Sequence, residues 1–357
     1  MSLASMFKIT ERKSSVKTEI IAGLTTFMTM AYILIVQPGA ICGYGPDAGI
    51  TDPAGVFISK EAIMVTCALI SAVITLLMGF YANMPFALST GLGSNFMFGA
   101  LIASGECTYG RAMLITLISG IIFVLLSAFG IRDLIVKMIP KNIKISISTA
   151  IGFFIAYVGF KNTGIGTFTD GIAMGDFTQP AVLLAVLGLL LIGVLTAYKV
   201  NGAILIGIVV VTVLGIPFGV TVLPEQFFKV PDMSSISNIV FNFDAAGFLA
   251  PSTLTLMFIV FVGDFFSTLG TVLGVAGKAG MLDKDGNLPE IQKPFLVDAI
   301  GTCVGAMFGC TTITTFVESS AGVEAGGRTG LTAITTAVMF LLTIFASPLF
   351  QIGRAHV

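Results

Sequence analysis

Charged residues are scarce in this sequence. Asp, Glu, Lys and Arg account for 10% of its 357 residues, whereas hydrophobic residues account for 55% and the mean hydropathy is +1.01. Because a soluble domain usually carries about 25% charged residues, this composition excludes an ordinary soluble protein and indicates a polytopic membrane protein. The formal net charge of −1 offers no excess of positive charge that would attract a nucleic acid.

Residues and motifs on which many enzymes depend are also missing. The chain has no Trp and a single His, and its five Cys are scattered without a CxxC pair, which is typical of small buried residues rather than of a metal or disulfide site. It contains no GxxxxGKS/T phosphate loop, no HExxH and no GxSxG motif. These absences exclude ATP hydrolysis within this chain as an energy source and argue against an enzyme.

Neither end of the sequence predicts a functional segment. Residues 1–19 are polar and basic, so no signal peptide is expected. The last six residues, IGRAHV (352–357), read as the translation of a widely used sequencing adapter. We interpret them as an artefact, with the natural sequence ending near Gln351 in a truncated gene product. On this interpretation His356 belongs to no site.

Long apolar stretches make up most of the chain. A transmembrane helix needs about 20 apolar residues, and nine stretches meet this requirement fully or as shorter helices, near 20–38, 61–81, 111–130, 143–161, 180–198, 202–220, 252–276, 295–310 and 329–350. Two further segments at membrane depth, 84–102 and 311–327, are rich in Gly and Thr and have a polar residue near the middle. We expect these two to be broken helices, which gives eleven crossings.

The distribution of Lys and Arg predicts the orientation. Basic residues gather in the N-terminal tail and in the loop at 131–144, whereas acidic residues outnumber basic ones in the loops at 39–60, 161–179 and 221–250. Because short loops rich in Lys and Arg stay in the cytoplasm, the N-terminus is predicted to be cytoplasmic. The basic loops all fall on the cytoplasmic side, and the acidic loops outside, only if both broken segments are counted as full crossings of the membrane.

The order of the spans indicates an inverted repeat. The first seven end near residue 220, and the following four repeat the same plan, with a broken segment third. A repeat of odd length places its second copy upside down, and paired broken helices in such copies are typical of secondary transporters. The predicted fold class is therefore an all-α polytopic membrane protein with a transporter fold, in which the second repeat is incomplete at about 11 of 14 segments.

Asp264 is the sharpest functional signal. It lies in the middle of the span at 252–276, where a charged side chain costs about 2.5–3.5 kcal/mol on insertion scales. Ser267 and Thr268 follow at i+3 and i+4 and share its helix face, which makes a polar face suited to a solute and to a proton on the carboxylate. The alternative is a structural carboxylate that neighbouring helices satisfy.

The broken segments carry one candidate each. Glu318 is placed where a half helix begins after an extended stretch, so its carboxylate would lie beside free backbone N–H groups. Its alternative role is simply to complement the helix dipole. Asn95 holds the matching position in the first repeat, where its amide both donates and accepts hydrogen bonds. Its alternative role is to cap the half helix that follows. Glu324 is expected nearer the cytoplasmic end, close to Arg328.

Three apolar neighbours complete the candidate binding residues. Phe96 follows Asn95 and Phe316 is two residues before Glu318, and both rings offer flat faces for stacking. Val317 lies between Phe316 and Glu318 in the sequence. Because the chain contains 30 Phe, packing against lipid or core is the alternative for each ring.

Four motifs resemble one known family. They are TTFMTMAYILIVQP (25–38), GLGSNF (91–96), GDFFSTLGTVLGVA (263–276) and TTFVESSAGVEAGGRTGLTA (314–333). Together they are similar to the AzgA-like purine permeases of the nucleobase–cation symporter-2 family, and the similarity extends to about Gln351. It implies fourteen segments in two inverted repeats of seven. Their third and tenth segments would each have a short strand leading into a half helix.

The resemblance also implies a division into domains. Segments 1–4 (residues 1–130) and 8–11 (221–350) would form a core domain, and segments 5–7 (131–220) would form half of a gate domain. Segments 12–14, the other half of the gate, have no counterpart in this sequence.

The resemblance assigns roles to three residues. Asp264 and Glu318 would bind substrate and carry the coupling proton, with Asn95 in support. Two positions depart from the family pattern, since Ser267 stands where a second acid is frequent and Gln37 where Asn is frequent.

The function implied is proton-coupled uptake of hypoxanthine, guanine or adenine across the cytoplasmic membrane. The expected partners are the purine base and membrane lipids, with a homodimer left open, and no cofactor other than the proton is expected. Uracil, xanthine or a small anion remain alternative cargoes, although an anion carrier would dispense with acidic ligands. A third hypothesis is a fragment that does not transport.

Overall fold

The computed structural model of the chain describes residues 3–43, 47–130, 171–198, 203–221, 233–284 and 286–346, together with Val200 and scattered positions between 146 and 167. The predicted loop at 131–144, most of the predicted span at 143–161 and the tail at 352–357 lie outside the described residues.

Helices dominate the described part of the chain, with short strands between some of them. In chain order the elements are α1 (Leu3–Met6), α2 (Val16–Met30), α3 (Ile33–Cys42), β1 (Gly49–Thr51), β2 (Phe57–Ser59), α4 (Lys60–Leu77), a π-helical turn (Met78–Ala82), β3 (Leu88–Thr90), α5 (Leu92–Ala103), α6 (Tyr109–Ala128), β4 (Gly166–Thr167), β5 (Ala173–Met174), α9 (Pro180–Ala197), α10 (Ala203–Gly215), α11 (Met233–Ser237), α12 (Pro251–Lys278), α13 (Gln292–Met307), β6 (Ile313–Thr315), α14 (Ser319–Glu324) and α15 (Gly330–Phe345).

Five helical stretches among the described residues are long and apolar enough to cross a membrane: Val16–Cys42, Lys60–Ala82, Tyr109–Ala128, Pro180–Ala197 and Pro251–Lys278. Shorter apolar helices include α5 and α15. The chain is therefore a mostly helical protein with several apolar spans, as its composition predicts.

Local sequence explains where most of the long helices begin. Each of α2, α4, α6 and α15 starts after a hydroxyl residue whose oxygen accepts a backbone N–H of the first turn, and α9 and α12 start with a proline. Both arrangements suit the first turn, because its N–H groups have no partner within the helix.

The first span differs from the continuous helix predicted at 20–38. It is divided at Ala31 and Tyr32, a two-residue joint between α2 and α3. At the joint the N–H of Leu34 bonds to the carbonyl of Ala31, and the N–H of Ile35 bonds to that of Tyr32. These i→i−3 hydrogen bonds tighten the backbone into a 3₁₀-like turn. Hydropathy does not reveal such a turn, since most residues around it are apolar.

The two segments predicted to be broken each contain a strand followed by a helix, β3–α5 and β6–α14. The strands pair antiparallel in the registers Leu88↔Thr315, Ser89↔Thr314 and Thr90↔Ile313, and all six residues are buried. The pairing brings together residues more than 220 positions apart and places the starts of α5 and α14 at one crossing.

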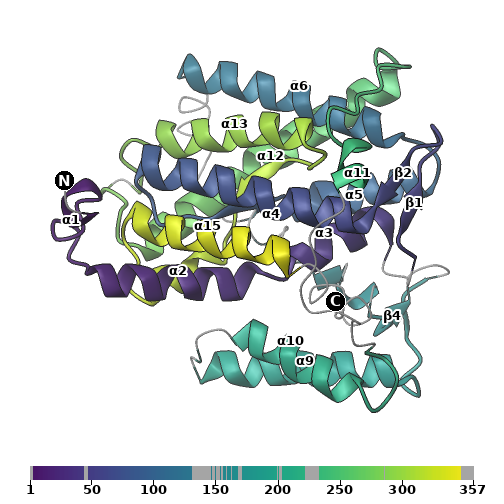
Figure 1. Cartoon of the computed structure of the whole chain (residues 1–357), viewed down its shortest axis with the longest axis horizontal. Helices are drawn as coiled ribbons and strands as arrows, with labels where there is room; N and C mark the ends of the chain where they lie inside the picture. The colour runs from purple at the N-terminus through teal and green to yellow at the C-terminus, as the bar shows by residue number, and fades with distance from the viewer. Residues whose placement is uncertain are drawn as a thin grey trace.

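The long helices lie side by side in layers (Figure 1), and α4, α12 and α13 contact the strand pair. Helix α15 contacts α2 on one side and α4 on the other, and α13 packs against α6 and α4. The pair α9 and α10 lies along the lower edge of the view, beyond α2. The interior between α4, α12 and α13 is a hydrophobic cluster that includes Phe123, Phe265 and Phe295.

A buried carboxylate in α2 joins this helix to the start of α15. Glu19 is fully buried and accepts the backbone N–H groups of Arg328 (3.0 Å) and Thr329 (3.1 Å) and the hydroxyl of Thr332 (2.5 Å). Arg12 donates to the carbonyls of Asn83 and Arg328 at 2.7 and 2.9 Å. These bonds tie the residues that lead into α15 to α2.

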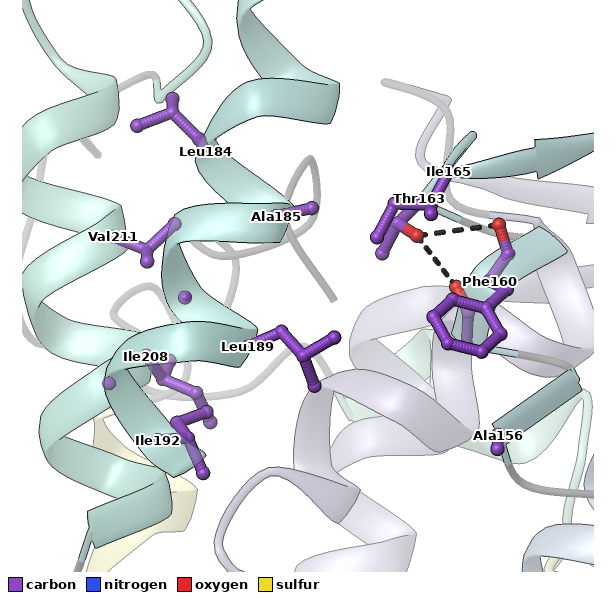
Figure 2. Close-up of a pocket in the computed structure, with 13 residues that line it drawn as sticks. Ala156, Phe160, Thr163, Ile165, Leu184, Ala185, Leu189, Ile192, Ile208 and Val211 are labelled. Carbon is purple, nitrogen blue, oxygen red and sulfur yellow. Dashed lines mark hydrogen bonds between the residues drawn. The ribbon is translucent and has the colours of Figure 1, made fainter. Parts of the chain in front are cut away.

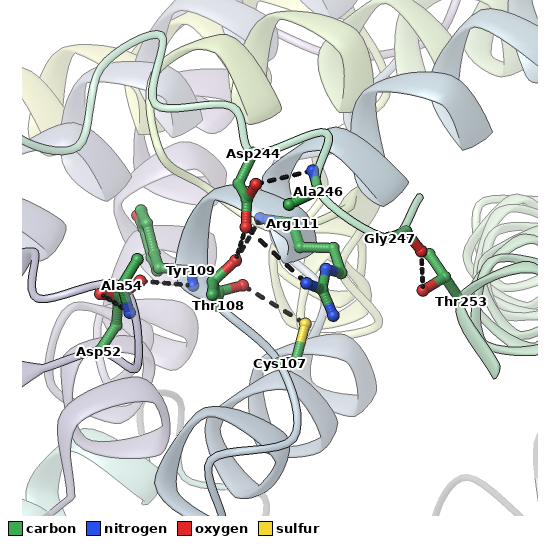
Figure 3. A network of polar contacts seen from close by, with 10 residues as sticks. All are labelled: Asp52, Ala54, Cys107, Thr108, Tyr109, Arg111, Asp244, Ala246, Gly247 and Thr253. Carbon is green, nitrogen blue, oxygen red and sulfur yellow. Dashed lines mark hydrogen bonds and ion pairs between the residues drawn. The ribbon is translucent and has the colours of Figure 1, made fainter. Parts of the chain in front are cut away.

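A second polar network lies at the opposite end of the helices (Figure 3). Asp52, in the hairpin of β1 and β2, accepts the N–H of Tyr109 at 2.9 Å. Asp244 accepts the Thr108 hydroxyl at 2.6 Å and lies 3.9 Å from the guanidinium of Arg111. The network joins the start of α6 to the loops before α4 and α12. The hairpin was not among the predicted elements.

Candidate substrate site

The three principal candidates are held by three different elements near the strand crossing. Asn95 is in the second turn of α5, Glu318 is the residue immediately before α14, and Asp264 is in the middle of α12. Both α5 and α14 follow directly from the paired strands β3 and β6, and β6 contacts α12. The structure therefore gathers around one strand pair the residues that the sequence predicts for the site.

Glu318 is partly buried and bonded to the joint of the first span. The Tyr32 hydroxyl donates to its Oε1 at 2.5 Å, and the Thr29 hydroxyl, which lies 2.9 Å from the carbonyl of Thr26, is 3.3 Å from its backbone carbonyl. Although Glu318 precedes α14, its side chain makes no capping bond to that helix. The carboxylate is instead oriented toward Tyr32, a partner that the sequence analysis did not predict.

Asn95 connects the two broken segments. Its side chain is fully buried, and its Nδ2 donates to Thr90 Oγ1 at 3.1 Å, while Thr311 Oγ1 donates to its Oδ1 at 2.5 Å. Thr90 ends β3 and Thr311 precedes β6. Gly91, not Asn95, is the N-cap residue of α5. The amide thus bonds across the crossing, and its direct contact with a substrate stays a prediction.

The polar side chains on one face of α12 bond to two neighbouring elements, α13 and β6. Asp264 is buried, and the Thr302 hydroxyl of α13 lies 3.5 Å from its Oδ2. Thr268 is fully buried and donates to Asp298 at 2.8 Å, with Thr314 Oγ1 at 3.1 Å. Ser267 is only partly buried. Thr268 therefore serves contacts within the protein, which favours a structural role over the predicted contact with a solute.

Asp298 is a buried carboxylate that the sequence analysis missed. It lies in α13 with no exposed surface and accepts the Thr268 hydroxyl and, at 3.2 Å, the N–H of Thr315 in β6. The signal that singles out Asp264, a carboxylate inside a predicted span, applies equally to Asp298 within 295–310.

The apolar candidates differ in exposure. Phe316 is buried in a cluster with Phe27 and Phe340, and Phe96 packs against that cluster partly buried. Val317 is 54% exposed. Packing thus accounts for Phe316, whereas Val317 borders open space beside Glu318.

Glu324 lies away from the other acids. It ends α14 and pairs with Lys278 at the end of α12, at 2.6 Å between carboxylate and ammonium. The guanidinium of Arg328, the neighbour expected for Glu324, donates instead to the carbonyls of Val323 and Gly327.

An apolar cavity of 280 Å³ lies elsewhere, between residues 156–165 and the pair α9 and α10 (Figure 2). Its lining includes Phe160, Leu184 and Val211 and contains no predicted site residue. Within the described residues, no group of three or more His, Cys, Asp or Glu is placed to hold a metal ion.

Solved structures with the same architecture are membrane transporters. The transmembrane domain of a cyanobacterial bicarbonate transporter, BicA, matches with a TM-score of 0.60 and 14% identity, over 95% of this chain and 86% of that one. SLC26A9 matches with a TM-score of 0.55 and 13% identity, over 99% and 59% of the two chains. The fold is therefore that of multi-pass membrane transporters.

The sequence comparisons define the family. Residues 17–352 match the model of the permease family Xan_ur_permease. The putative permease MJ0326 of Methanocaldococcus jannaschii is 39% identical, over 97% of this chain and 77% of its own length. The guanine/hypoxanthine permease PbuO of Bacillus subtilis is 37% identical (96% and 78%), and the adenine permease AdeQ of Escherichia coli is 35% identical (98% and 76%). The chain belongs to this permease family, and it is a transporter rather than an enzyme.

Proposed function

We propose that the protein takes up a purine nucleobase, hypoxanthine, guanine or adenine, together with a proton across the cytoplasmic membrane. The observation that carries the proposal is the position of the Glu318 carboxylate at the start of α14, beside the crossing of β3 and β6. The names of the relatives PbuO and AdeQ support a purine cargo.

The chemistry of a purine suits these residues. The edges of the ring present N–H donors beside ring-nitrogen or carbonyl acceptors. The carboxylates of Glu318 and Asp264 accept from the donors, and the N–H groups in the first turn of α5 serve the acceptors, because a helix leaves its first N–H groups unpaired. Val317, exposed beside Glu318, offers an apolar contact for a flat ring.

A proton would reduce the cost of moving these acids with their cargo. A charged side chain in the hydrocarbon region is unfavourable by several kcal/mol, and its protonated form is much less so. We assign this role to Glu318 and Asp264. Glu19 is bonded to the start of α15, Asp298 accepts from Thr268 and Thr315, and Glu324 is paired with Lys278.

The proposed movement uses the domains that the resemblance implies. Residues 1–130 and 221–350 would move as a core that carries the site, relative to a gate that includes 131–220, with the N-terminus on the cytoplasmic side. Uracil or xanthine remains the alternative cargo in the same site. A small anion is disfavoured, because two carboxylates repel it.

Uptake of radiolabelled hypoxanthine into proteoliposomes with an imposed pH gradient tests the proposal. We expect uptake by the unaltered protein, its loss with a protonophore, and a loss of at least tenfold in Glu318→Gln and in Asp264→Asn. Glu324→Gln is the matched control, since Glu324 lies at the exposed end of the same half helix. Competition by unlabelled adenine, guanine, xanthine and uracil then ranks the bases. Normal uptake in both acid variants would discard the site.

A further inference from the structure

The joint of the first span contacts the side chain of Glu318. Tyr32 Oη donates to the carboxylate at 2.5 Å. Thr29 Oγ1, at the end of α2, lies 3.3 Å from the carbonyl of the same residue, but it lies closer to the carbonyls of Thr26 (2.9 Å) and Thr25 (3.2 Å) within α2. The two hydroxyls lie 286 and 289 positions away from Glu318 in the sequence. The side chain of one residue of the second repeat is therefore held by the first span.

The backbone around Tyr32 explains how the hydroxyl reaches this position. Tyr32 lies at the tightened joint, where its carbonyl accepts the N–H groups of both Ile35 and Val36. Its ring is partly buried and packs against the cluster that contains Phe27 and Phe316. Both the backbone and the ring are thus held in place, so the hydroxyl is presented in one direction.

The carboxylate of Glu318 has few other restraints within α14. Its side chain makes no capping bond to that helix, and the next residue toward the N-terminus, Val317, is 54% exposed. A Glu side chain with free rotamers loses up to about 2 kcal/mol of entropy when a ligand fixes it. A partner that fixes the side chain beforehand removes that cost from binding.

We infer that Tyr32 is a positioning residue, which orients the Glu318 carboxylate so that its second oxygen is presented to the substrate. This inference rests on the proposed function for its effect on substrate, but the contact itself does not. It assigns a specific task to the joint between α2 and α3, the feature that distinguishes this span from a continuous helix.

Transport kinetics of Tyr32→Phe test the effect on substrate. Removing the hydroxyl is expected to raise the half-saturating hypoxanthine concentration about tenfold with little change in maximal rate, because a hydrogen bond to a charged group is worth about 1.5–3 kcal/mol. Tyr81→Phe is the matched control, since Tyr81 is 50% exposed on the π-helical turn. Thr29→Val and Thr25→Val should both have little effect, because the shortest hydrogen bond of each hydroxyl lies within α2.

A double-mutant cycle in thermal stability tests the contact without any substrate. Tyr32→Phe should lower the melting temperature of the purified protein, and should lower it by less than half as much when Glu318 is already replaced by Ala. Glu318→Leu provides the same cycle if the Ala variant folds poorly.

Additive temperature losses, or kinetics of Tyr32→Phe equal to those of Tyr81→Phe, would overturn the inference. Absence of hypoxanthine uptake by the unaltered protein would instead refute the proposed function. In that case the thermal cycle still decides whether Tyr32 fixes Glu318.

Discussion

The hydroxyl of Thr268 donates to the carboxylate of Asp298 at 2.8 Å, and both side chains are completely buried. Asp298 also accepts the N–H of Thr315, so one carboxylate joins α12, α13 and β6. The helix that carries Asp264 is thereby fixed to the strand that leads to Glu318. The positions of Asp264 and Glu318 relative to each other therefore depend on a third acid, Asp298.

Replacing Asp298 is expected to destabilise the protein before any effect on substrate is considered. Asp298→Ala leaves the Thr268 hydroxyl and the Thr315 N–H without this acceptor, and each buried donor left unsatisfied costs about 1–3 kcal/mol. Asp298→Asn keeps one acceptor oxygen and should lose less. Melting temperature in detergent without substrate measures both, with the exposed Asp47→Asn as control. A melting temperature for Asp298→Ala equal to that of the control would show that the carboxylate holds nothing together.

The sequence predicts those parts of the fold that depend on local composition. Apolar stretches locate α4, α6, α9 and α12 within a few residues, because a membrane span is defined by length and hydropathy. The segments at 84–102 and 311–327 are recognisable because Gly, Thr and a central polar residue interrupt the apolar pattern. The joint at Tyr32 is not recognisable, since apolar residues continue through it and only its hydrogen bonds depart from a helix.

The site is predicted in part for the same reason. Glu318, Asp264 and Asn95 can be selected because a polar residue in an apolar segment is locally conspicuous. Their partners cannot be selected in this way. Tyr32 reaches Glu318 across 286 residues and Thr311 reaches Asn95 across 216, and such pairs are determined by packing. Thr268 illustrates the limit, because a shared helix face does not tell that its hydroxyl donates to Asp298.

Two glycines of α5 are expected to respond very differently to alanine. A Cβ at Gly99 would lie 1.8 Å from the carbonyl oxygen of Ala40 in α3, whereas a Cβ at Gly93 would meet nothing within 4 Å. Gly99→Ala must therefore push α5 away from α3, and overpacking of this kind costs about 1–3 kcal/mol or more. Gly93→Ala should leave the melting temperature unchanged or slightly raised, because Ala favours helix over Gly.

Hypoxanthine uptake should also fall in Gly99→Ala, by more than its loss of folded protein explains, since α5 carries Asn95. Gly93→Ala is the control for stability alone, because Gly93 lies in the first turn of α5, whose N–H groups we assign to the substrate. Equal melting temperatures for the two variants would contradict the close approach of α5 to α3.

The network around Asp244 gives the protein a stability that depends on pH (Figure 3). The hydrogen bond from the Thr108 hydroxyl, followed by that from the N–H of Ala246, lowers the pKa of Asp244 below its ordinary value, with a smaller contribution from the charge of Arg111. Because the pKa is lower in the folded state, the stabilisation is complete above the unfolded value of about 3.9. It is lost as the pH falls through the folded value.

Asp244→Asn should therefore lower the melting temperature at pH 7. At a pH low enough to protonate Asp244, the melting temperatures of the variant and the unaltered protein should be equal. The loss at pH 7 should be small, about 1–3 °C, because Asp244 lies near the surface and such pairs are worth at most about 1 kcal/mol. Melting temperatures of both proteins between pH 7 and pH 3 measure the narrowing difference, and Thr108→Val, which removes the strongest donor, should reproduce part of it. A difference that stays constant down to pH 3 would mean that Asp244 stabilises the loop by packing alone. The charge of the carboxylate would then have no part in holding α6 to the start of α12.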